Sequence, residues 1–335
     1  MEVINTNSLS NDKGIPSAGR PDGSDADGPQ QIGSIAGVGN VRGTAYPSIT
    51  VTGQTWSMSL AYQMGKSYGK DMQAVGRSGA YAFGANIHRS AYTGRNFEYF
   101  SEDGFLSGRM AANASKGVAV NGKYCFMKHY AVNDQEYHRV GLYTWLSEQA
   151  LREIYLKPFK ECVLYGELSA LMTSFNRVGS VWSGGSEAML MGILRNEWQF
   201  HGMIITDYCE SSQLMDQAQA IRAGSNYGMT MHYTSGVSTS LPNKNTSTPR
   251  LQWRIKDICK EVIYGYIHPL LVNYNYNETA DEEEYLIVTT SKNPWEWWRP
   301  TLVSVDVAIG GGLLFCLYLL LRPMVEPKER KEEMA

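Results

Sequence analysis

Short apolar runs that end in polar residues recur between residues 80 and 230 of the chain. Buried parallel strands have this appearance, because helices cover both faces of a parallel sheet. The pattern therefore predicts a series of strands, each followed by a helix. The runs lie at residues 81–85, 124–127, 168–173 and 203–206, with a weaker run at 223–226.

Two of the segments between these runs have apolar residues at helical spacing. A serine precedes each segment, and a serine side chain in that position commonly accepts a hydrogen bond from the first helical turn. We therefore expect two amphipathic helices, which begin after Ser147 and Ser186. Their apolar faces comprise Leu151, Ile154, Tyr155, Phe159 and Cys162 in the first helix, and Leu190, Ile193, Leu194 and Trp198 in the second.

Repeated βα units of about 30 to 40 residues build either an open doubly wound sheet or a closed barrel. Polar residues stand directly after several runs, which favours the barrel, because the strands of a barrel end at one common mouth. We predict an α/β fold with a (β/α)8 TIM-like barrel, whole or incomplete, over residues 21–270. An irregular segment at residues 1–20 precedes it.

Composition narrows the class of protein. The chain has 335 residues, 43% of them hydrophobic, so it can bury a large core and is neither disordered nor a small disulfide-linked protein. A formal net charge of -3 argues against nucleic acid as a partner. The five cysteines are scattered singly, which predicts neither a disulfide framework nor a metal site. No nucleotide or flavin motif is present, so we expect no cofactor.

Residues 301–321 form an apolar stretch that is long enough to cross ~30 Å of hydrocarbon as a helix, with Asp306 as its single charge. Three tryptophans precede the stretch and basic residues follow it, as at the two faces of a membrane. We therefore expect a single transmembrane helix at 301–321, a linker at 271–300 and a basic cytoplasmic tail at 322–335. A buried core helix is the alternative interpretation.

This orientation places the barrel on the extracytoplasmic side of the membrane. Residues 1–30 nevertheless contain no secretory signal that would export it. We therefore expect the chain to be part of a longer protein.

Short motifs follow one another in a specific order: DGP at 27–29, GTAYPS at 43–48, GRNFE at 94–98, KHYAVNDQE at 128–136, MTSFN at 172–176 and TDY at 206–208. With these motifs, the segment from about residue 20 to 235 resembles the barrel domain of glycoside hydrolase family 3, the β-glucosidase type. The resemblance implies a hydrolase of carbohydrate metabolism, whose substrate is an oligosaccharide or another β-glycoside.

The resemblance implies a retaining mechanism, in which an Asp at the end of a barrel strand attacks the anomeric carbon and a carboxylic acid protonates the leaving group. By motif match, the nucleophile is Asp207. It follows directly on the apolar run 203–206, and cationic neighbours would keep it ionised at the barrel mouth. A helix N-cap after a strand is the alternative role of Asp207.

The resemblance also assigns the contacts to the sugar. Asp27 would accept hydrogen bonds from hydroxyls at the far end of the sugar, and a turn residue in a loop is its alternative role. Arg95, Lys128 and His129 would donate hydrogen bonds to hydroxyls and help to keep the nucleophile ionised. The alternatives are an ion pair between Arg95 and Glu98, and a buried structural role for His129.

Arg139 and Met172 complete the predicted pocket. Arg139 would either orient the loop that carries Glu136 or contact the sugar directly. Met172 would pack against the sugar, although a methionine in a buried strand is ordinarily a core residue.

The chain departs from the family pattern mildly at 223–226, where AGSN replaces the common A-G-x-D, and more seriously in two other respects. Phe175 stands where the family usually has a tyrosine, so a hydroxyl is missing beside the nucleophile. The general acid is also missing, because nothing after residue 235 resembles the α/β sandwich whose Glu supplies the proton. The stretch at 128–133 does not match the catalytic-histidine loop of single-domain members. Glu136 and Glu210 are the nearest carboxylates, and neither fits the role of the acid.

We therefore interpret the chain as the C-terminal barrel part of a membrane-anchored family member, which needs a separate α/β sandwich domain for its acid/base Glu. The predicted function is a retaining exo-β-glycosidase. The alternatives are a catalytically impaired, membrane-anchored carbohydrate-binding protein and a purely structural barrel.

Overall fold

The computed structural model describes residues 11–12, 23–33, 43–208, 215–229 and 249–279, together with positions 304, 311, 312, 315, 318 and 319. The chain divides into two units, residues 1–281 and 282–335, and the fold below belongs to the first. Apart from those six positions, the predicted membrane span at 301–321 and the predicted tail lie outside the described residues. Within the described parts, no helix is both long and apolar enough to cross a membrane.

One seven-stranded sheet organises the first unit, with the strand order β1-β2-β3-β4-β6-β9-β10. Neighbouring strands are parallel, except that β1 pairs with β2 in the antiparallel sense. The strands are β1 Asn11–Asp12, β2 Gly23–Asp27, β3 Gly79–Tyr81, β4 Tyr124–Tyr130, β6 Ala170–Thr173, β9 Met203–Tyr208 and β10 Tyr227–Met229.

The sheet confirms a parallel α/β architecture, in the incomplete form of the predicted barrel. Over the described residues, β1 and β10 are two open edges, and they do not pair with each other. A closed (β/α)8 barrel needs eight strands whose first and last members pair. The described part of the chain supplies fewer parallel strands than that and builds part of a barrel.

The predicted strands agree with this sheet at four of the five apolar runs. They correspond to β4, β6, β9 and, with a shift toward the N-terminus, β3. The run at 223–226 is not a strand, because helix α6 ends at Ala223 and β10 begins only at Tyr227. Strand β2 was not predicted, because its sequence GSDAD is polar. Burial of Asp25 in β2 is made possible by a hydrogen bond of 2.8 Å from the Tyr124 hydroxyl.

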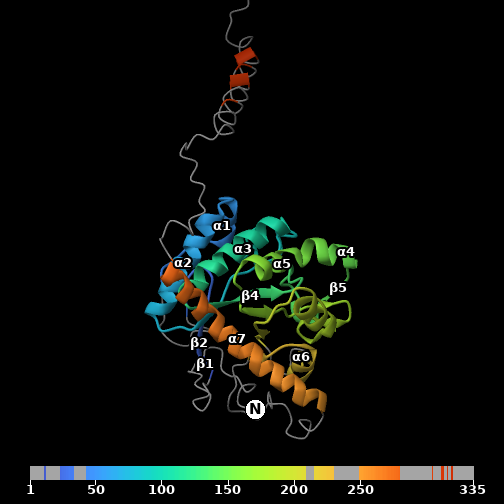
Figure 1. Cartoon of the computed structure of the whole chain (residues 1–335). Helices are drawn as coiled ribbons and strands as arrows, with labels where there is room; N and C mark the ends of the chain where they lie inside the picture. The colour runs from blue at the N-terminus through green and yellow to red at the C-terminus, as the bar shows by residue number, and fades with distance from the viewer. Residues whose placement is uncertain are drawn as a thin grey trace, which may run out of the picture. The chain divides into compact units, whose positions relative to one another are not determined.

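Helices cover the sheet. Helix α3 packs against α2 on one side and against α5 on the other, and Figure 1 shows these three helices side by side. The longer helices are α1 Ile49–Gln54, α2 Met58–Ala74, α3 Gly104–Ala119, α5 Lys157–Tyr165, the π-helix η7 Ala188–Glu197, α6 Gln217–Ala223 and α7 Pro249–Thr279. Shorter elements are η3 Asn96–Glu98, η4 Arg139–Gly141, α4 Glu148–Ala150, the π-turn η5 Leu151–Tyr155 and η6 Ser183–Gly185, with a small sheet of β5 Tyr143–Thr144, β7 Arg177–Val178 and β8 Val181–Trp182.

The two predicted helices are present, and both predicted serine caps are confirmed. The backbone N–H of Ala150 donates to the Ser147 side chain at 3.1 Å, and that of Met189 donates to Ser186 at 3.4 Å. The first helix is divided into α4, η5 and α5. Its predicted apolar face is wrong at Ile154, which is 44% exposed, because the wider π-turn displaces side chains from α-helical spacing.

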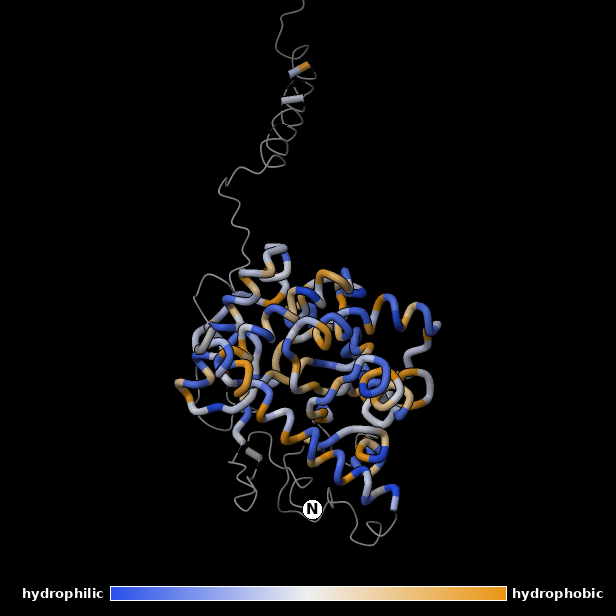
Figure 2. The backbone as a smooth tube through the Cα atoms, viewed as in Figure 1, coloured by the Kyte–Doolittle hydropathy of each residue, from blue (hydrophilic) through white to orange (hydrophobic). Residues whose placement is uncertain are grey.

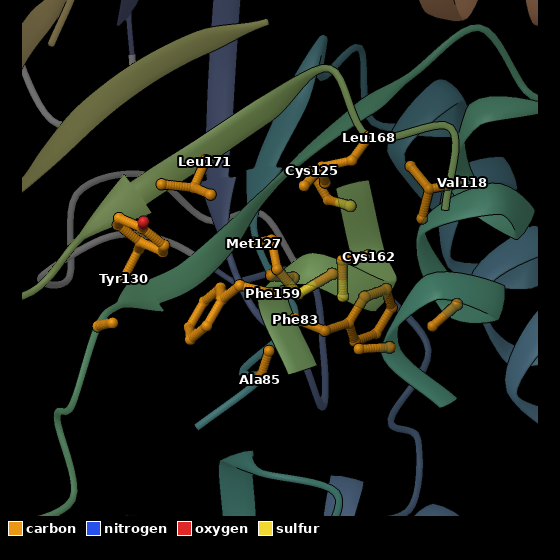
Figure 3. Packing of buried hydrophobic residues seen from close by; sticks show 14 of the residues in the cluster. Phe83, Ala85, Val118, Cys125, Met127, Tyr130, Phe159, Cys162, Leu168 and Leu171 are labelled. Atoms are coloured by element: carbon orange, nitrogen blue, oxygen red, sulfur yellow. The ribbon is translucent and has the colours of Figure 1, made fainter. Parts of the chain in front are cut away.

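The sheet is buried on both faces, and alternate residues of each strand point to opposite faces. Side chains of one face join the core beneath α3 and α5, where Figure 3 shows strand, loop and helix residues in contact. The members of this core labelled there are Phe83, Ala85, Val118, Cys125, Met127, Tyr130, Phe159, Cys162, Leu168 and Leu171. Side chains of the other face form a second core with α7, and they include Tyr124, Phe126, Ala170, Met172, Met203, Ile205, Ile258 and Val262.

Helix α7 is tied to the end of the sheet by buried charges. Glu261 accepts hydrogen bonds from Arg254 at 2.8 Å, from Arg195 at 3.0 Å and from the Asn226 amide at 2.7 Å. Figure 2 shows hydrophobic and hydrophilic segments alternating along this helix, as expected when one side packs on a core. The helix continues to Thr279, beyond the predicted domain boundary at residue 270.

Candidate active site

Strand alternation brings three of the predicted site residues, Lys128, Met172 and Asp207, to one face of the sheet. Lys128 follows Phe126 by two residues in β4, and Asp207 follows Ile205 by two residues in β9. Phe126 and Ile205 belong to the core beside α7, so the polar residues continue that same face toward the carboxyl ends of the strands. The register of β4 against β6 shifts between Met127 and Tyr130, which is where a bulge can redirect neighbouring side chains.

A pocket of about 630 Å³ opens at these strand ends. All seven residues that the sequence singled out contribute to its wall, namely Asp27, Arg95, Lys128, His129, Arg139, Met172 and Asp207. The structure therefore brings the candidates together, while their roles toward a sugar stay predictions. The remaining wall consists of Tyr81, Gly94, Phe97, Glu98, Glu136, Tyr208 and Met229.

Asp207 lies largely buried near the end of β9. Its Oδ1 accepts a hydrogen bond of 2.7 Å from the backbone N–H of Tyr208, whereas its Oδ2 has no hydrogen-bond partner among the described residues. Burial raises the pKa of Asp207, and the positive charges of Arg95 and Arg139 oppose this rise. The alternative N-cap role falls partly on residues 209–214, which lie outside the described residues.

Lys128 carries a buried ammonium group between two carboxylates. Its Nζ lies 3.7 Å from Oδ1 of Asp27 and 3.6 Å from Oε2 of Glu98. Asp27 ends strand β2 and its side chain is half-exposed at the pocket, rather than in an irregular loop. The ion pairs meet the requirement that a buried lysine has charged partners.

Arg95 forms the ion pair with Glu98 that we considered as an alternative to sugar binding. Its Nε and one terminal nitrogen donate to the two Glu98 oxygens at 3.0 and 2.7 Å. Burial raises the pKa of Glu98, but Lys128 and Arg95 more than offset this effect and hold it below its ordinary value. Arg95 still lines the pocket, so the pair and a sugar contact are compatible. Glu98 was missed as a site residue, although it belongs to the GRNFE motif.

The GRNFE segment approaches the loop after β4 closely at Gly94. This residue has a φ of +97°, and a Cβ atom there would lie 3.1 Å from Cγ of Glu136. Glycine adopts this backbone conformation without strain and leaves room for the neighbouring side chain. The first residue of the motif therefore allows two walls of the pocket to meet.

His129 is buried with its ring between Tyr99 and Asp207. Its Nε2 lies 3.5 Å from Oδ2 of Asp207, and its Nδ1 lies 3.1 Å from the Tyr99 hydroxyl. Burial and the charges of Arg95 and Lys128, among others, hold the pKa of His129 well below its ordinary value. His129 is therefore a neutral ring. Tyr99 was not recognised from the sequence.

Arg139 holds the Glu136 side chain, as one of its two predicted roles requires, while its contact with the sugar stays a prediction. It donates to Glu136 at 2.5 Å, and it also lines the pocket. Its guanidinium stacks 4.0 Å from the ring centre of Phe175, which is itself buried and outside the pocket wall. Met172 is buried and reaches the pocket from β6, so it is both a core and a wall residue.

The described wall offers no carboxylic acid that is free to protonate a leaving group. Asp27 and Glu98 face Lys128, and Glu136 is paired with Arg139. A general acid must keep a transferable proton, and a carboxylate held next to a cation loses it readily. Asp207 is a buried carboxylate of this wall whose Oδ2 has no hydrogen-bond partner among the described residues.

The family model "Glycosyl hydrolase family 3 N terminal domain" matches residues 31–271. Among curated relatives, the chain is 33% identical to Beta-glucosidase A of Butyrivibrio fibrisolvens over 240 residues, which are 72% of this chain and 28% of that protein. It is 31% identical to Thermostable beta-glucosidase B of Acetivibrio thermocellus over 274 residues, which are 81% of this chain and 36% of that protein.

Solved structures show the same likeness. The beta-glucosidase of Kluyveromyces marxianus in complex with glucose has a TM-score of 0.71 and 28% identity, over 83% of this chain and 33% of that one. Beta-glucosidase 3B of Thermotoga neapolitana in complex with glucose has a TM-score of 0.65 and 27% identity, over 82% of this chain and 40% of that one.

The chain thus spans 28% and 36% of the length of the two curated relatives described above. The matching family model describes an N-terminal domain, whereas the sequence led us to expect a C-terminal part. The place of the barrel in a longer protein stays a prediction. The match over residues 31–271, with the shared fold, shows that this chain belongs to glycosyl hydrolase family 3.

Proposed function

We propose that the chain carries the nucleophile and the sugar pocket of a retaining β-glycosidase with β-glucosidase-like activity. The observation that supports this most is the state of Asp207, which lies at a strand end with Oδ2 unpaired and faces the pocket. Arg95 and Arg139 supply positive charge that favours the ionised, nucleophilic form. The names of the relatives point to the same reaction.

The reaction has two steps. A carboxylate oxygen of Asp207 attacks the anomeric carbon, and the bond from that carbon to the leaving oxygen breaks as a general acid protonates that oxygen. Water then attacks the same carbon, gives up a proton to the former acid, and releases Asp207 and the sugar with retained configuration. The cations and Asp27 would hold the hydroxyls of the sugar during both steps.

We propose that the acid belongs to a further domain, of the α/β sandwich type that the family resemblance implies. The described pocket wall has no free acid, because Asp27, Glu98 and Glu136 all face cations. A catalytically impaired carbohydrate-binding protein is the second candidate function. The observation that favours it is Phe175, a hydrocarbon ring buried beneath Arg139 where the family usually has a tyrosine.

We also propose that residues 301–321 anchor the protein in a membrane as a single helix, with the barrel on the extracytoplasmic side. The support is the apolar stretch itself, with tryptophans before it and basic residues after it. Truncation at residue 285 should then convert a detergent-requiring protein into one that stays in the aqueous phase. A full-length chain that needs no detergent would contradict the anchor.

The nucleophile is tested with a 2-fluoro sugar that carries a dinitrophenyl leaving group. The leaving group departs without protonation, so the trapped glycosyl-enzyme should form even without the acid. Peptide mapping by mass spectrometry should place the label on Asp207, and Asp207→Asn should remain unlabelled. Asp216→Asn, which changes a helix-capping Asp of α6, should label normally. A label on another carboxylate would refute the assignment.

A further inference from the structure

The hydroxyl of Tyr99 lies behind the pocket, between the ring of His129 and the amide of Asn133. It is 3.1 Å from Nδ1 of His129, and it accepts a hydrogen bond of 3.3 Å from Nδ2 of Asn133. Tyr99 is 1% exposed, so water does not compete for these contacts. The arrangement of donors and acceptors around this hydroxyl therefore decides where its own proton goes.

The orientation of Asn133 is set by Glu136. The second Nδ2 contact of Asn133 is to Oε1 of Glu136, at 3.1 Å. The Glu136 carboxylate is paired with Arg139 and acts only as an acceptor, so the amide nitrogen must face it. The opposite orientation would bring the amide oxygen against the carboxylate. One hydrogen of Asn133 is thus directed at Glu136 and the other at the Tyr99 oxygen.

Tyr99 must consequently donate its single proton to His129. Burial raises the pKa of Tyr99 above its ordinary value, so the hydroxyl keeps this proton. A ring nitrogen that accepts a hydrogen bond carries no proton, and in a neutral ring the proton is then on the other nitrogen. That nitrogen is Nε2, which lies 3.5 Å from Oδ2 of Asp207.

Contacts of the backbone and of the side chain restrict the position of the His129 ring. Its backbone N–H donates to Asn86 at 2.7 Å, and its backbone carbonyl accepts from the Asn86 amide at 3.0 Å. The side chain is buried, and it packs edge-on against the Tyr99 ring. The backbone and ring contacts therefore fix the ring position, and the Tyr99 hydroxyl selects the tautomer.

We propose that Tyr99 is a positioning residue, whose hydroxyl holds His129 in the tautomer with the proton on Nε2 and so presents an N–H group to Asp207. The tautomer itself follows from the contacts above, and only its use in catalysis rests on the proposed function. Nε2 makes no hydrogen bond to Oδ2 in this structure, but a proton on this nitrogen, 3.5 Å from Oδ2, favours the ionised carboxylate, whereas a lone pair in its place would disfavour it. The other groups that act on Asp207 are Arg95, Lys128, Arg139 and the Tyr208 backbone N–H.

The tautomer can be read directly by NMR of the chain with ¹⁵N-labelled histidine. His129 is identified as the signal lost in His129→Gln, among the six histidines of the chain. We expect a neutral ring with a protonated Nε2 and an unprotonated, hydrogen-bonded Nδ1. In Tyr99→Phe the Nδ1 signal should lose its hydrogen-bond shift, and the ring should populate both tautomers.

Tyr130→Phe is the matched control. Tyr130, the next residue in the chain, is also fully buried, and its hydroxyl donates to the backbone carbonyl of Met189 at 3.1 Å and not to the His129 ring. This variant should leave the His129 signals unchanged. A protonated Nδ1 or a doubly protonated ring in the unsubstituted chain refutes the proposal, whether or not Tyr99→Phe folds.

The catalytic use of the tautomer is tested with the fluorosugar reaction at different pH values. Tyr99→Phe should lower the rate of labelling roughly three- to tenfold, as expected for the loss of one positioned hydrogen bond. Its labelling should also need a higher pH than that of the unsubstituted chain, while Tyr130→Phe keeps the original profile. An unchanged rate and profile would refute the catalytic use. A chain that shows the expected NMR spectrum but never labels Asp207 would instead count against the proposed function alone.

Discussion

Arg95 donates two hydrogen bonds to Glu98, at 3.0 and 2.7 Å, and both residues line the pocket. Lys128 approaches the same carboxylate to 3.6 Å. One buried anion therefore stabilises two cations that the proposed function assigns to the sugar. Without Glu98, the Arg95 guanidinium and the Lys128 ammonium would lose the anion that they share.

Glu98→Gln should therefore destabilise the fold by about 3 kcal/mol, as expected when one member of a buried ion pair is removed. The folded pKa of Glu98 is lowered, so its stabilising effect is present above the ordinary pKa and is lost as the pH falls through the folded pKa. Urea unfolding at pH 7 and in acid should show a difference between variant and parent that shrinks in acid. Glu197→Gln, which breaks an exposed pair with Arg152, should have little effect at either pH.

Because the described pocket wall has no free carboxylic acid, we predict a strong dependence on the leaving group. General acid catalysis typically contributes ~10² to 10⁴ in rate, and poor leaving groups such as a second sugar need it most. The chain by itself should hydrolyse cellobiose hardly at all, and dinitrophenyl glucoside less poorly. Azide needs no base, so it should accelerate turnover and give a glycosyl azide of retained configuration. Rapid cellobiose hydrolysis without azide would show that an acid is present within these 335 residues.

As the pH is lowered, labelling of Asp207 should be lost at a higher pH than expected for an ordinary aspartate. Burial raises its pKa, and only the ionised carboxylate attacks, so the rate falls as the pH drops through the raised value. Arg139→Gln removes one opposing charge and should move the midpoint to still higher pH. Arg109→Gln, on α3 and stacked on Tyr165, is the control. The pH midpoint of fluorosugar inactivation is measured for the parent and both variants. The same midpoint in Arg139→Gln as in the parent would contradict this account.

Asp134, in the loop after β4, offers a test of stability. It is buried, and neither carboxylate oxygen has a hydrogen-bond partner among the described residues. Burial raises its pKa to about 7, although the positive charge of Arg89 opposes the rise. The native state therefore binds more protons than the unfolded state between about pH 4 and 7, so stability falls as the pH rises through this window.

Asp134→Asn cannot ionise and should escape this loss. Its free energy of unfolding, relative to the parent, should improve between pH 4 and pH 8 by an amount on the order of 2–4 kcal/mol. Urea titrations of both proteins at the two pH values measure it, and the difference at pH 4 serves as the internal control. A relative stability that is the same at both pH values would show that Asp134 titrates normally.

Strands that consist largely of apolar residues, such as β4 and β9, were predicted from the sequence because apolar runs indicate burial. It failed for β2, because Asp25 is buried through a partner, Tyr124, that lies far away in the chain. The incomplete sheet follows from the number of βα units, which the periodicity did not count reliably. At 223–226, apolar residues belong to the end of α6 and not to a strand, because short apolar runs do not distinguish the two.

The candidate site was predicted in its membership and in local pairs such as Arg95 with Glu98, rather than in its long-range pairings. Motif residues such as Lys128 and Asp207 were recognised, and the structure brings them to one pocket. Glu98 and Tyr99 were not, because the partner of a buried polar group depends on which loops the fold brings together. The role of the Tyr99 hydroxyl depends on its contacts with His129 and Asn133, which the sequence does not indicate.

Strand β9 carries core residues and the proposed nucleophile on alternate positions of one short segment. Met203 and Ile205 pack beside α7, while Ile204 points to the helices on the opposite face. Deleting any one residue between Ile204 and Asp207 would therefore do more than shorten the strand. It would move the remaining side chains of β9 to the opposite face of the sheet. The carboxylate would then face an apolar layer, away from the cations of the pocket. The spacing inside this strand is thus as strict a requirement for the chemistry as the aspartate itself.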